Sequence, residues 1–176
     1  MSLDHLWAGW RSAYVAAAVE SSAGEVAASR AAAPLACVFC HILAGEDVTA
    51  LQHLVARSKR SAALLNAYPY TSGHLLVMPI RHVATLEELD EDEAAELWRM
   101  AREAVRALQA AYQPDGMNLG ANLGRAAGAG IPGHLHLHAL PRWHGDTNFM
   151  TSVAGARVLP ESLDISLAKL QAAWPS

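Results

Sequence analysis

Three histidines alternate with apolar residues late in the chain, at His134, His136 and His138. Residues two apart in an extended strand lie on the same face, so this spacing predicts three imidazoles on one face and Leu135 and Leu137 on the other. The leucine face is typical of a buried core. The histidine face is not explained by packing, because an unsatisfied buried imidazole costs about 1–3 kcal/mol. We therefore expect the histidine face to carry chemistry.

Two kinds of chemistry fit such a row. Imidazoles bind zinc, but same-face residues lie about 6.6 Å apart, so the outer two, about 13 Å apart, do not both reach one ion from a regular strand. Alternatively, a neutral imidazole attacks a phosphoryl group while its neighbours donate hydrogen bonds to the developing charge. Histidine suits this role because its pKa of about 6.5 leaves it mostly neutral at pH 7. The preceding glycine-rich stretch 124–133 can bring backbone N–H groups close to an anion.

A pair of cysteines forms a second group of potential ligands. Cys37 and Cys40 have the two-residue spacing that is typical of zinc sites. A closed site needs two more ligands, and His82 and His134 are the candidates for a structural Cys2His2 site. The rival hypothesis, a redox dithiol, lacks the thioredoxin-like βαβ setting. We therefore predict a structural Zn²⁺ and no organic cofactor.

The elements that position these residues follow from hydrophobic spacing and turn signals. Asp90, with Glu93 three residues later, predicts a capped helix that Pro114 terminates. We expect strands at 51–57, 62–67, 74–80, 117–123 and 134–140, the last ended by Pro141, and a final helix over about 161–174. This order predicts an α+β domain on an antiparallel sheet. We expect an N-terminal helix and small-residue connector at 1–34, the main domain at 35–160 and a C-terminal helix at 161–176.

Composition excludes several classes of protein. Thirteen basic against seventeen acidic residues give a net charge of −4, which argues against nonspecific nucleic-acid binding. A hydrophobic content of 52% excludes a disordered chain. No apolar run approaches the ~20 residues of a membrane span, and two cysteines do not make a disulfide framework. We expect a soluble, cytoplasmic protein with no nucleic-acid or membrane partner.

The stretch 133–140, Gly-His-Leu-His-Leu-His-Ala-Leu, resembles the signature of the histidine-triad (HIT) family. Other blocks resemble the family in the same order, namely 37–45, 66–79 and 81–83, so that the resemblance covers about 35–160. Within the family, the chain is similar to bacterial diadenosine tetraphosphate phosphorylases and HIT-type ATP adenylyltransferases. That similarity rests on residues 65–70 and 141–149.

The resemblance implies a fold and a mechanism. The fold is a HIT-like five-stranded antiparallel sheet with flanking helices, which dimerises through a continuous sheet. In the mechanism, His136 attacks the α-phosphorus of a nucleotide and forms a nucleotidyl-histidine intermediate, which water or orthophosphate then resolves. The resemblance further implies that His138 hydrogen-bonds the reacting phosphate and that His74 supports the site from the neighbouring strand.

The resemblance also implies binding roles. Asn66 corresponds to a residue that binds ribose hydroxyls, and Asn122 to one that approaches the phosphates. Cys37, Cys40, His82 and His134 match the ligands of zinc-containing members. One position departs from the family, because Gly130 stands where many members carry a polar residue on the α-phosphate. Backbone N–H groups of Gly130 or Ile131 can substitute for it, whereas Pro132 has none.

The leading hypothesis is therefore an enzyme that cleaves a dinucleoside polyphosphate by phosphorolysis, acting as a homodimer on a nucleotide and orthophosphate. One alternative is a HIT hydrolase or nucleoside phosphoramidase with water as acceptor. Another is a hydrolase with a catalytic zinc on the histidine strand. A third, from a different class, is a nucleotide-binding module without catalysis.

Overall fold

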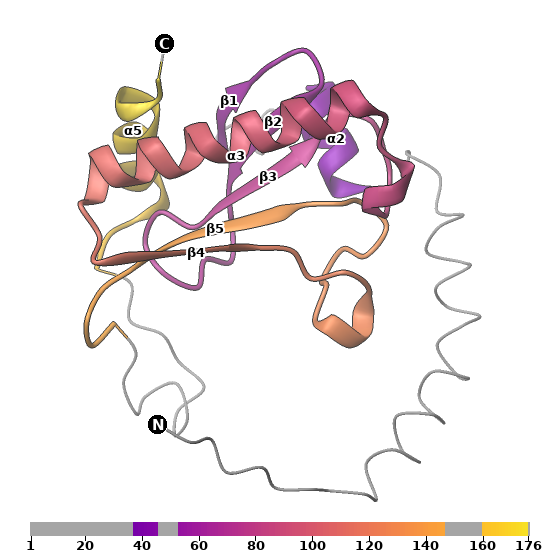
Figure 1. Ribbon diagram of the computed structural model, residues 1–176. Helices are drawn as coiled ribbons and strands as arrows, with labels where there is room; N and C mark the ends of the chain where they lie inside the picture. Colours follow the sequence, from indigo (N-terminus) through magenta and orange to yellow (C-terminus); the bar gives the residue numbers. More distant parts are fainter. Residues whose placement is uncertain (1–36, 46–52, 147–159, 176) are drawn as a thin grey trace, which may run out of the picture.

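The computed structural model describes residues 37–45, 53–146 and 160–175. Five strands form one antiparallel sheet in the order β1-β2-β3-β5-β4 (Figure 1). The strands are β1 (Leu54–Arg57), β2 (Ser61–Leu65), β3 (Leu75–Pro79), β4 (Gly116–Gly120) and β5 (Leu137–Arg142). The helices are α2 (Val38–Ala44), α3 (Glu91–Tyr112) and α5 (Leu163–Ala173), with short 3₁₀ turns η3 (Leu86–Glu88) and η4 (Arg125–Ala127). The predicted fold class is confirmed, and the N-terminal helix expected within 1–34 lies outside the described residues.

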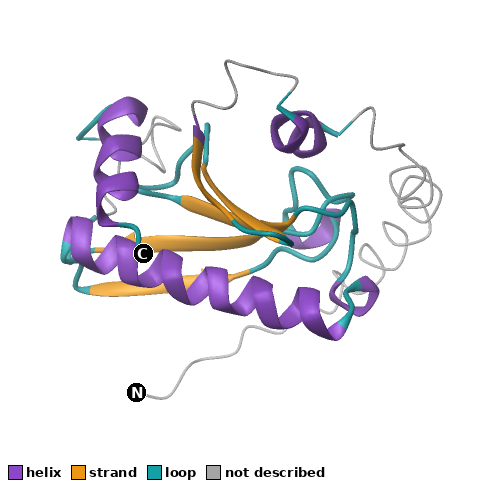
Figure 2. Ribbon diagram, turned by 90° about the horizontal axis from the view of Figure 1, so that it is seen from above, coloured by secondary structure: helices purple, strands orange, loops and turns teal. Residues whose placement is uncertain are grey.

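The sheet separates two hydrophobic cores because its central strands are apolar on both faces. Alternate residues of β2 and β3 pack on the long helix α3 and on α5, which lie over one face (Figures 1 and 2). The intervening residues pack on α2 at the opposite face. The α3 face of β5 carries Leu137 and Ala139, so His136 and His138 point to the α2 face, as the alternation predicts.

The helix α3 begins at the predicted capping box. The Asp90 carboxylate accepts a hydrogen bond from the Glu93 N–H at 2.7 Å, and the Asp90 N–H donates to the Glu93 carboxylate at 3.1 Å. Leu97, Ala101 and Leu108 follow one another on the apolar face of this helix and are fully buried. The helix ends at Tyr112, and Gln113 follows in the left-handed conformation.

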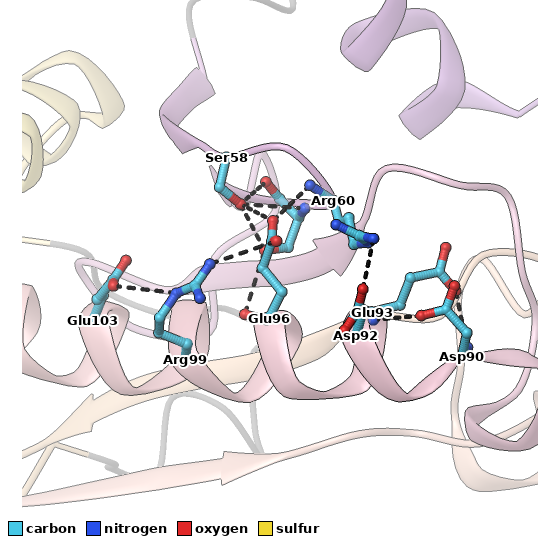
Figure 3. Close-up of polar contacts among 9 residues, drawn as sticks. Ser58, Arg60, Asp90, Asp92, Glu93, Glu96, Arg99 and Glu103 are labelled. Atoms are coloured by element: carbon cyan, nitrogen blue, oxygen red, sulfur yellow. Dashed lines mark hydrogen bonds and ion pairs between the residues drawn. The ribbon is translucent and has the colours of Figure 1, made fainter.

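The β1–β2 hairpin is fastened to α3 by the carboxylate of Glu96, which is 8% exposed (Figure 3). This carboxylate accepts hydrogen bonds from the Ser58 hydroxyl and the Arg60 N–H, both at 2.5 Å. The Arg99 guanidinium lies 3.5 Å from the second carboxylate oxygen of Glu96. The same guanidinium lies 4.0 Å from the carboxylate of Glu103. The hairpin that buries the Glu96 carboxylate thus also supplies its hydrogen-bond donors, which a buried charge requires.

The histidine strand differs from its predicted bounds at both ends. Regular pairing of β5 begins at Leu137, although the Leu135 N–H already donates to Val83 O at 2.6 Å. Pro141 does not end the strand, because it pairs with Met117 of β4. The partner β3 extends along β5 only to Ala139, so the missing N–H of Pro141 is tolerated where β5 has one neighbour.

Within the described residues, no helix combines the length and the apolar character that crossing a bilayer requires.

Candidate active site and metal-binding site

His136 is held in one tautomer by a backbone hydrogen bond. Its Nδ1 lies 2.8 Å from the carbonyl oxygen of His134. A carbonyl only accepts, so Nδ1 must carry the proton, and in the neutral ring the lone pair is on Nε2. The residue is 7% exposed, and burial lowers the pKa of its imidazole below the ordinary 6.5. His136 is therefore neutral at pH 7, with a nucleophilic nitrogen at Nε2.

His138 has the opposite tautomer, with its proton on Nε2. This tautomer is set by a relay of hydrogen bonds that runs from the 66–70 turn through His74 to His138. The Tyr70 N–H and the Asn66 amide nitrogen each lie 3.1 Å from Nδ1 of His74, which must accept. His74 therefore carries its proton on Nε2 and donates it to Nδ1 of His138 at 2.9 Å. The proton of neutral His138 is then on Nε2, which is buried and has no hydrogen-bond partner among the described residues.

The relay places two complementary imidazoles side by side. The rings of His136 and His138 are 5.1 Å apart, the first with a lone pair at Nε2 and the second with an N–H at Nε2. Burial, followed by the neighbouring His136, lowers the pKa of His138. Such a pair can attack an electrophilic centre with one ring and donate a hydrogen bond to an anionic oxygen with the other.

The turn that carries Asn66 is itself fixed by hydrogen bonds. The Asn66 side-chain oxygen accepts from the Tyr68 N–H at 3.0 Å, which assigns its nitrogen to His74. The Tyr70 ring lies 6.0 Å from the ring of His138 at an interplanar angle of 16°. Asn66 thus lies beside the predicted catalytic histidines, half-buried at the end of β2.

The other predicted phosphate contacts lie in the 121–133 loop. Asn122 is half-buried in the segment that follows β4, and Gly130 is exposed with open space where a side chain would stand. Ile131 packs against the α2 core. A side chain is therefore sterically possible at position 130, and its absence leaves the backbone as the donor there.

Cys37, Cys40, His82 and His134 converge on one point, as predicted, and could hold a metal ion. Their ligand atoms all lie within 4.8 Å of one another. Nδ1 of His134 is 3.4 Å from the Cys37 sulfur, and Nδ1 of His82 is 3.2 Å from the Cys40 sulfur. Zinc–ligand bonds of about 2.0–2.3 Å in a tetrahedron separate its ligand atoms by about 3.3–3.8 Å. The donor set therefore fits a closed zinc site.

The hydrogen bonding of His134 also fits metal binding. Its Nε2 lies 2.9 Å from the carbonyl oxygen of Pro79 and donates to it, which leaves the Nδ1 lone pair facing the two sulfurs. Burial lowers the pKa of His134 to about 4, so the ring is neutral and available as a ligand. Burial, followed by Cys37, raises the pKa of Cys40 to about 11, and a bound divalent cation would favour the thiolate.

Two aromatic residues of the site carry no role in the sequence-based prediction. Phe39, between the two cysteines, packs against His134 and His136. Tyr70 covers the His74–His138 relay. Phe39 has a weak sequence signal, since it is the aromatic residue inside the cysteine pair, whereas contact of Tyr70 with the histidines depends on the course of the 66–73 turn.

Comparison with known proteins gives the class to which this fold and site belong. The HIT domain family matches residues 28–145, about two thirds of the chain, and the chain belongs to this family. A solved Zn-bound histidine triad family protein from Mycobacterium smegmatis has 30% identity and a TM-score of 0.65, covering 79% of this chain and 93% of that one. A hypothetical histidine triad nucleotide-binding protein from Sulfolobus tokodaii strain7 has 31% identity and a TM-score of 0.64, covering 78% and 91%.

One curated relative extends the similarity beyond the domain. AP-4-A phosphorylase of Mycobacterium tuberculosis is 39% identical over 172 residues, which cover 98% of this chain and 85% of the relative. The relative is an enzyme, and the prediction of a HIT-family enzyme similar to such phosphorylases is confirmed.

Proposed function

We propose that the protein cleaves a dinucleoside polyphosphate, such as diadenosine tetraphosphate, by phosphorolysis through a nucleotidyl-histidine intermediate on His136. The observation that carries this proposal is the tautomer of His136. Its Nδ1–H is engaged by the His134 carbonyl, so the buried, neutral ring presents a lone pair at Nε2 beside the N–H of His138.

In the first step, the Nε2 lone pair of His136 attacks the α-phosphorus and forms an N–P bond. The bond from that phosphorus to the bridging oxygen breaks, and its electron pair leaves with the nucleoside polyphosphate. His138 donates its Nε2–H to a phosphate oxygen as negative charge develops there. His74 is a positioning residue, because its hydrogen bond keeps the proton of His138 on Nε2.

In the second step, an oxygen of orthophosphate attacks the same phosphorus. The N–P bond breaks and its electron pair returns to Nε2 of His136, which restores the starting tautomer. With diadenosine tetraphosphate, the first step releases ATP and the second releases ADP. We propose that Asn66 binds a ribose hydroxyl, and that Asn122 and the N–H groups of Gly130 and Ile131 contact the phosphates.

Support for this substrate comes from the relative that matches nearly the whole chain, which is named AP-4-A phosphorylase. The alternative with a catalytic zinc on the histidine strand has less support. Nδ1 of His136 and Nδ1 of His138 are both occupied by hydrogen bonds, and the four converging ligand atoms include neither residue.

We propose that Cys37, Cys40, His82 and His134 hold a structural Zn²⁺. When bound, the ion cross-links α2 to the end of β3 and the start of the histidine strand. Metal analysis of the purified protein and thermal unfolding with and without a chelator test this assignment. We expect one zinc per chain and a loss of several kcal/mol without it, which lowers Tm by about 10 °C or more. Absence of zinc, or an unchanged Tm after its removal, would contradict it.

We also propose a cytoplasmic homodimer that forms through β4. This strand is an edge of the sheet, and its Leu119 is 42% exposed, while Trp98 of α3 is 55% exposed. Pairing of two β4 edges would cover the backbone groups that an edge strand presents. Light scattering of the purified chain tests the dimer, and a monomeric mass would contradict it.

The catalytic proposal is tested with purified protein and diadenosine tetraphosphate, with and without orthophosphate, the products being separated by chromatography. We expect ADP and ATP only when phosphate is present. AMP and ATP without phosphate would overturn phosphorolysis in favour of hydrolysis. Absence of products in both cases, with turnover of a nucleoside phosphoramidate, would identify a phosphoramidase, whereas binding without turnover would identify a nucleotide-binding module.

The role of His136 is tested by His136→Ala. We expect loss of turnover while the protein stays folded, with a circular dichroism spectrum like that of wild type and a cooperative unfolding transition. His144→Ala is the matched control, because His144 is 94% exposed and its ring pairs only with Asp115 in the described structure. Retained turnover in His136→Ala would refute the mechanism.

A further inference from the structure

The aromatic ring of Phe39 lies between a metal-site histidine and the proposed nucleophile. Its centroid is 5.6 Å from the ring of His134, at an interplanar angle of 89°, and 5.3 Å from that of His136, at 66°. Phe39 is 5% exposed. It belongs to α2, the seven-residue helix that follows directly after Cys37 and contains Cys40. The position of the Phe39 ring therefore depends on how the cysteine pair is held.

His134 makes a second connection between the two sites. Its side chain contributes Nδ1 to the group of metal ligands, while its backbone carbonyl accepts the hydrogen bond that sets the tautomer of His136. His134 is fully buried and its other ring nitrogen is bonded to Pro79 O. A displacement of the His134 ring therefore also moves the carbonyl that orients His136.

We infer that Phe39 is a positioning residue, which together with the His134 carbonyl makes the orientation of His136 depend on an intact metal site. The inference rests on the proposed function in one respect, namely that His136 is the nucleophile. Two contacts link the four proposed metal ligands to His136. One is the packing of the Phe39 ring against His136, and the other is the hydrogen bond from His136 to the His134 carbonyl. Loss of either leaves the imidazole free to rotate and to exchange its proton between Nδ1 and Nε2.

The Phe39 ring constrains His136 in a way that the carbonyl alone does not. A single hydrogen bond at Nδ1 does not hold the imidazole in place, because the ring can swing about that bond and rotate away from the carbonyl, which breaks the bond and frees Nδ1 to lose its proton. The edge-to-face contact with the Phe39 ring restricts this movement, since interior side chains are close-packed. A displacement of about 1 Å at a reacting atom costs about 100-fold in rate.

The first test reads the tautomer of His136 by long-range ¹H–¹⁵N NMR of ¹⁵N-labelled protein, with the signals assigned by their loss in His136→Gln. We expect the Nδ1–H tautomer alone in zinc-loaded wild type. In zinc-loaded Phe39→Ala, and in chelator-treated wild type that remains folded, we expect a mixture of both tautomers. This readout requires no substrate.

The second test separates kcat from KM in a matched series of zinc-loaded variants. We expect Phe39→Ala to lower kcat about 10- to 100-fold, with KM changed less than about threefold. Phe39→Leu, which restores apolar volume without a flat ring, should recover part of the loss. Leu43→Ala is the control, because Leu43 lies one turn further along α2 in the same core and is 6% exposed. Zinc content is measured for each variant.

The inference is overturned if Phe39→Ala retains the tautomer of the wild type, or if its kcat falls no further than that of Leu43→Ala. It is also overturned if Phe39→Ala has lost its zinc and added zinc restores full kcat, since Phe39 would then serve the metal site alone. Failure of the proposed function gives a different result. Wild type would then turn over no nucleotide, while the NMR comparison would still report whether Phe39 orients His136.

Discussion

The ion pair between Arg81 and Glu93 offers a quantitative test of how α3 holds the segment that carries His82, a proposed metal ligand. Arg81 directly precedes His82 and donates two hydrogen bonds to the Glu93 carboxylate, from Nε at 2.8 Å and from a terminal nitrogen at 2.6 Å. The Glu93 side chain is 8% exposed, and that of Arg81 is 51% exposed. We change Glu93 to Gln, which keeps an oxygen for the Asp90 N–H but removes the charge.

The expected magnitude follows from the pKa of Glu93. The Arg81 hydrogen bonds, partly opposed by burial, lower this pKa from 4.5 to about 2. A shift of this size corresponds to at most about 3.4 kcal/mol, and the half-exposed partner reduces the contribution to about 1–2 kcal/mol. Because the folded protein holds the proton less tightly than the unfolded chain, this stabilisation is present above pH 4.5. It is lost as the pH falls towards 2.

The assay is urea unfolding of wild type, Glu93→Gln and Asp92→Asn at several pH values between 7 and 3. Asp92 is the matched control, because it pairs with Arg60 at 2.8 Å but its side chain is 77% exposed. We expect Glu93→Gln to be about 1–2 kcal/mol less stable than wild type at pH 7, and to lose less stability than wild type between pH 5 and 3. Equal losses for Glu93→Gln and Asp92→Asn at pH 7, or parallel pH profiles for wild type and Glu93→Gln, would refute the reasoning.

Two further predictions concern stability. Gly73→Ala should cost about 2–4 kcal/mol in urea unfolding, because φ is +77° and the added Cβ would lie 2.6 Å from the Tyr112 ring. Gly45→Ala has a similar φ of +76° with open space, so it should cost only about 1–2 kcal/mol, and equal costs would show that the ring moves aside. Glu96→Ala should cost about 2–4 kcal/mol, because it leaves the Ser58 hydroxyl and the Arg60 N–H without their acceptor. A cost below 1 kcal/mol would mean that water replaces the carboxylate there.

Much of the site could be predicted because its sequence signals are local. Period-two spacing assigned the histidines to one face and the leucines to the other, and the structure places Leu135 and Leu137 in the α3 core. The cysteine pair indicated half of a metal site, and the requirement for two more ligands indicated His82 and His134. The roles proposed for these residues stay predictions until the experiments above are done.

The bounds of the histidine strand were less predictable, for a physical reason. Proline ends a strand only where its missing N–H faces a partner, and β3 stops pairing with β5 before Pro141 is reached. On α3, Ala104 and Ala107 are buried as well as Leu97, Ala101 and Leu108, because both the sheet and α5 pack against this helix.

The sequence by itself determined which chemistry is available here, since imidazole and thiolate spacing is readable from the order of residues. It also determined the alternation of faces and the cap of α3, which depend on neighbours within a few positions. Only the tertiary structure decided the protonation pattern of the site. The tautomer of His136 depends on the His134 carbonyl, and that of His138 on His74 and through it on the 66–70 turn. A tautomer is set by the partner at the other ring nitrogen, and that partner is known only when distant segments have been brought together.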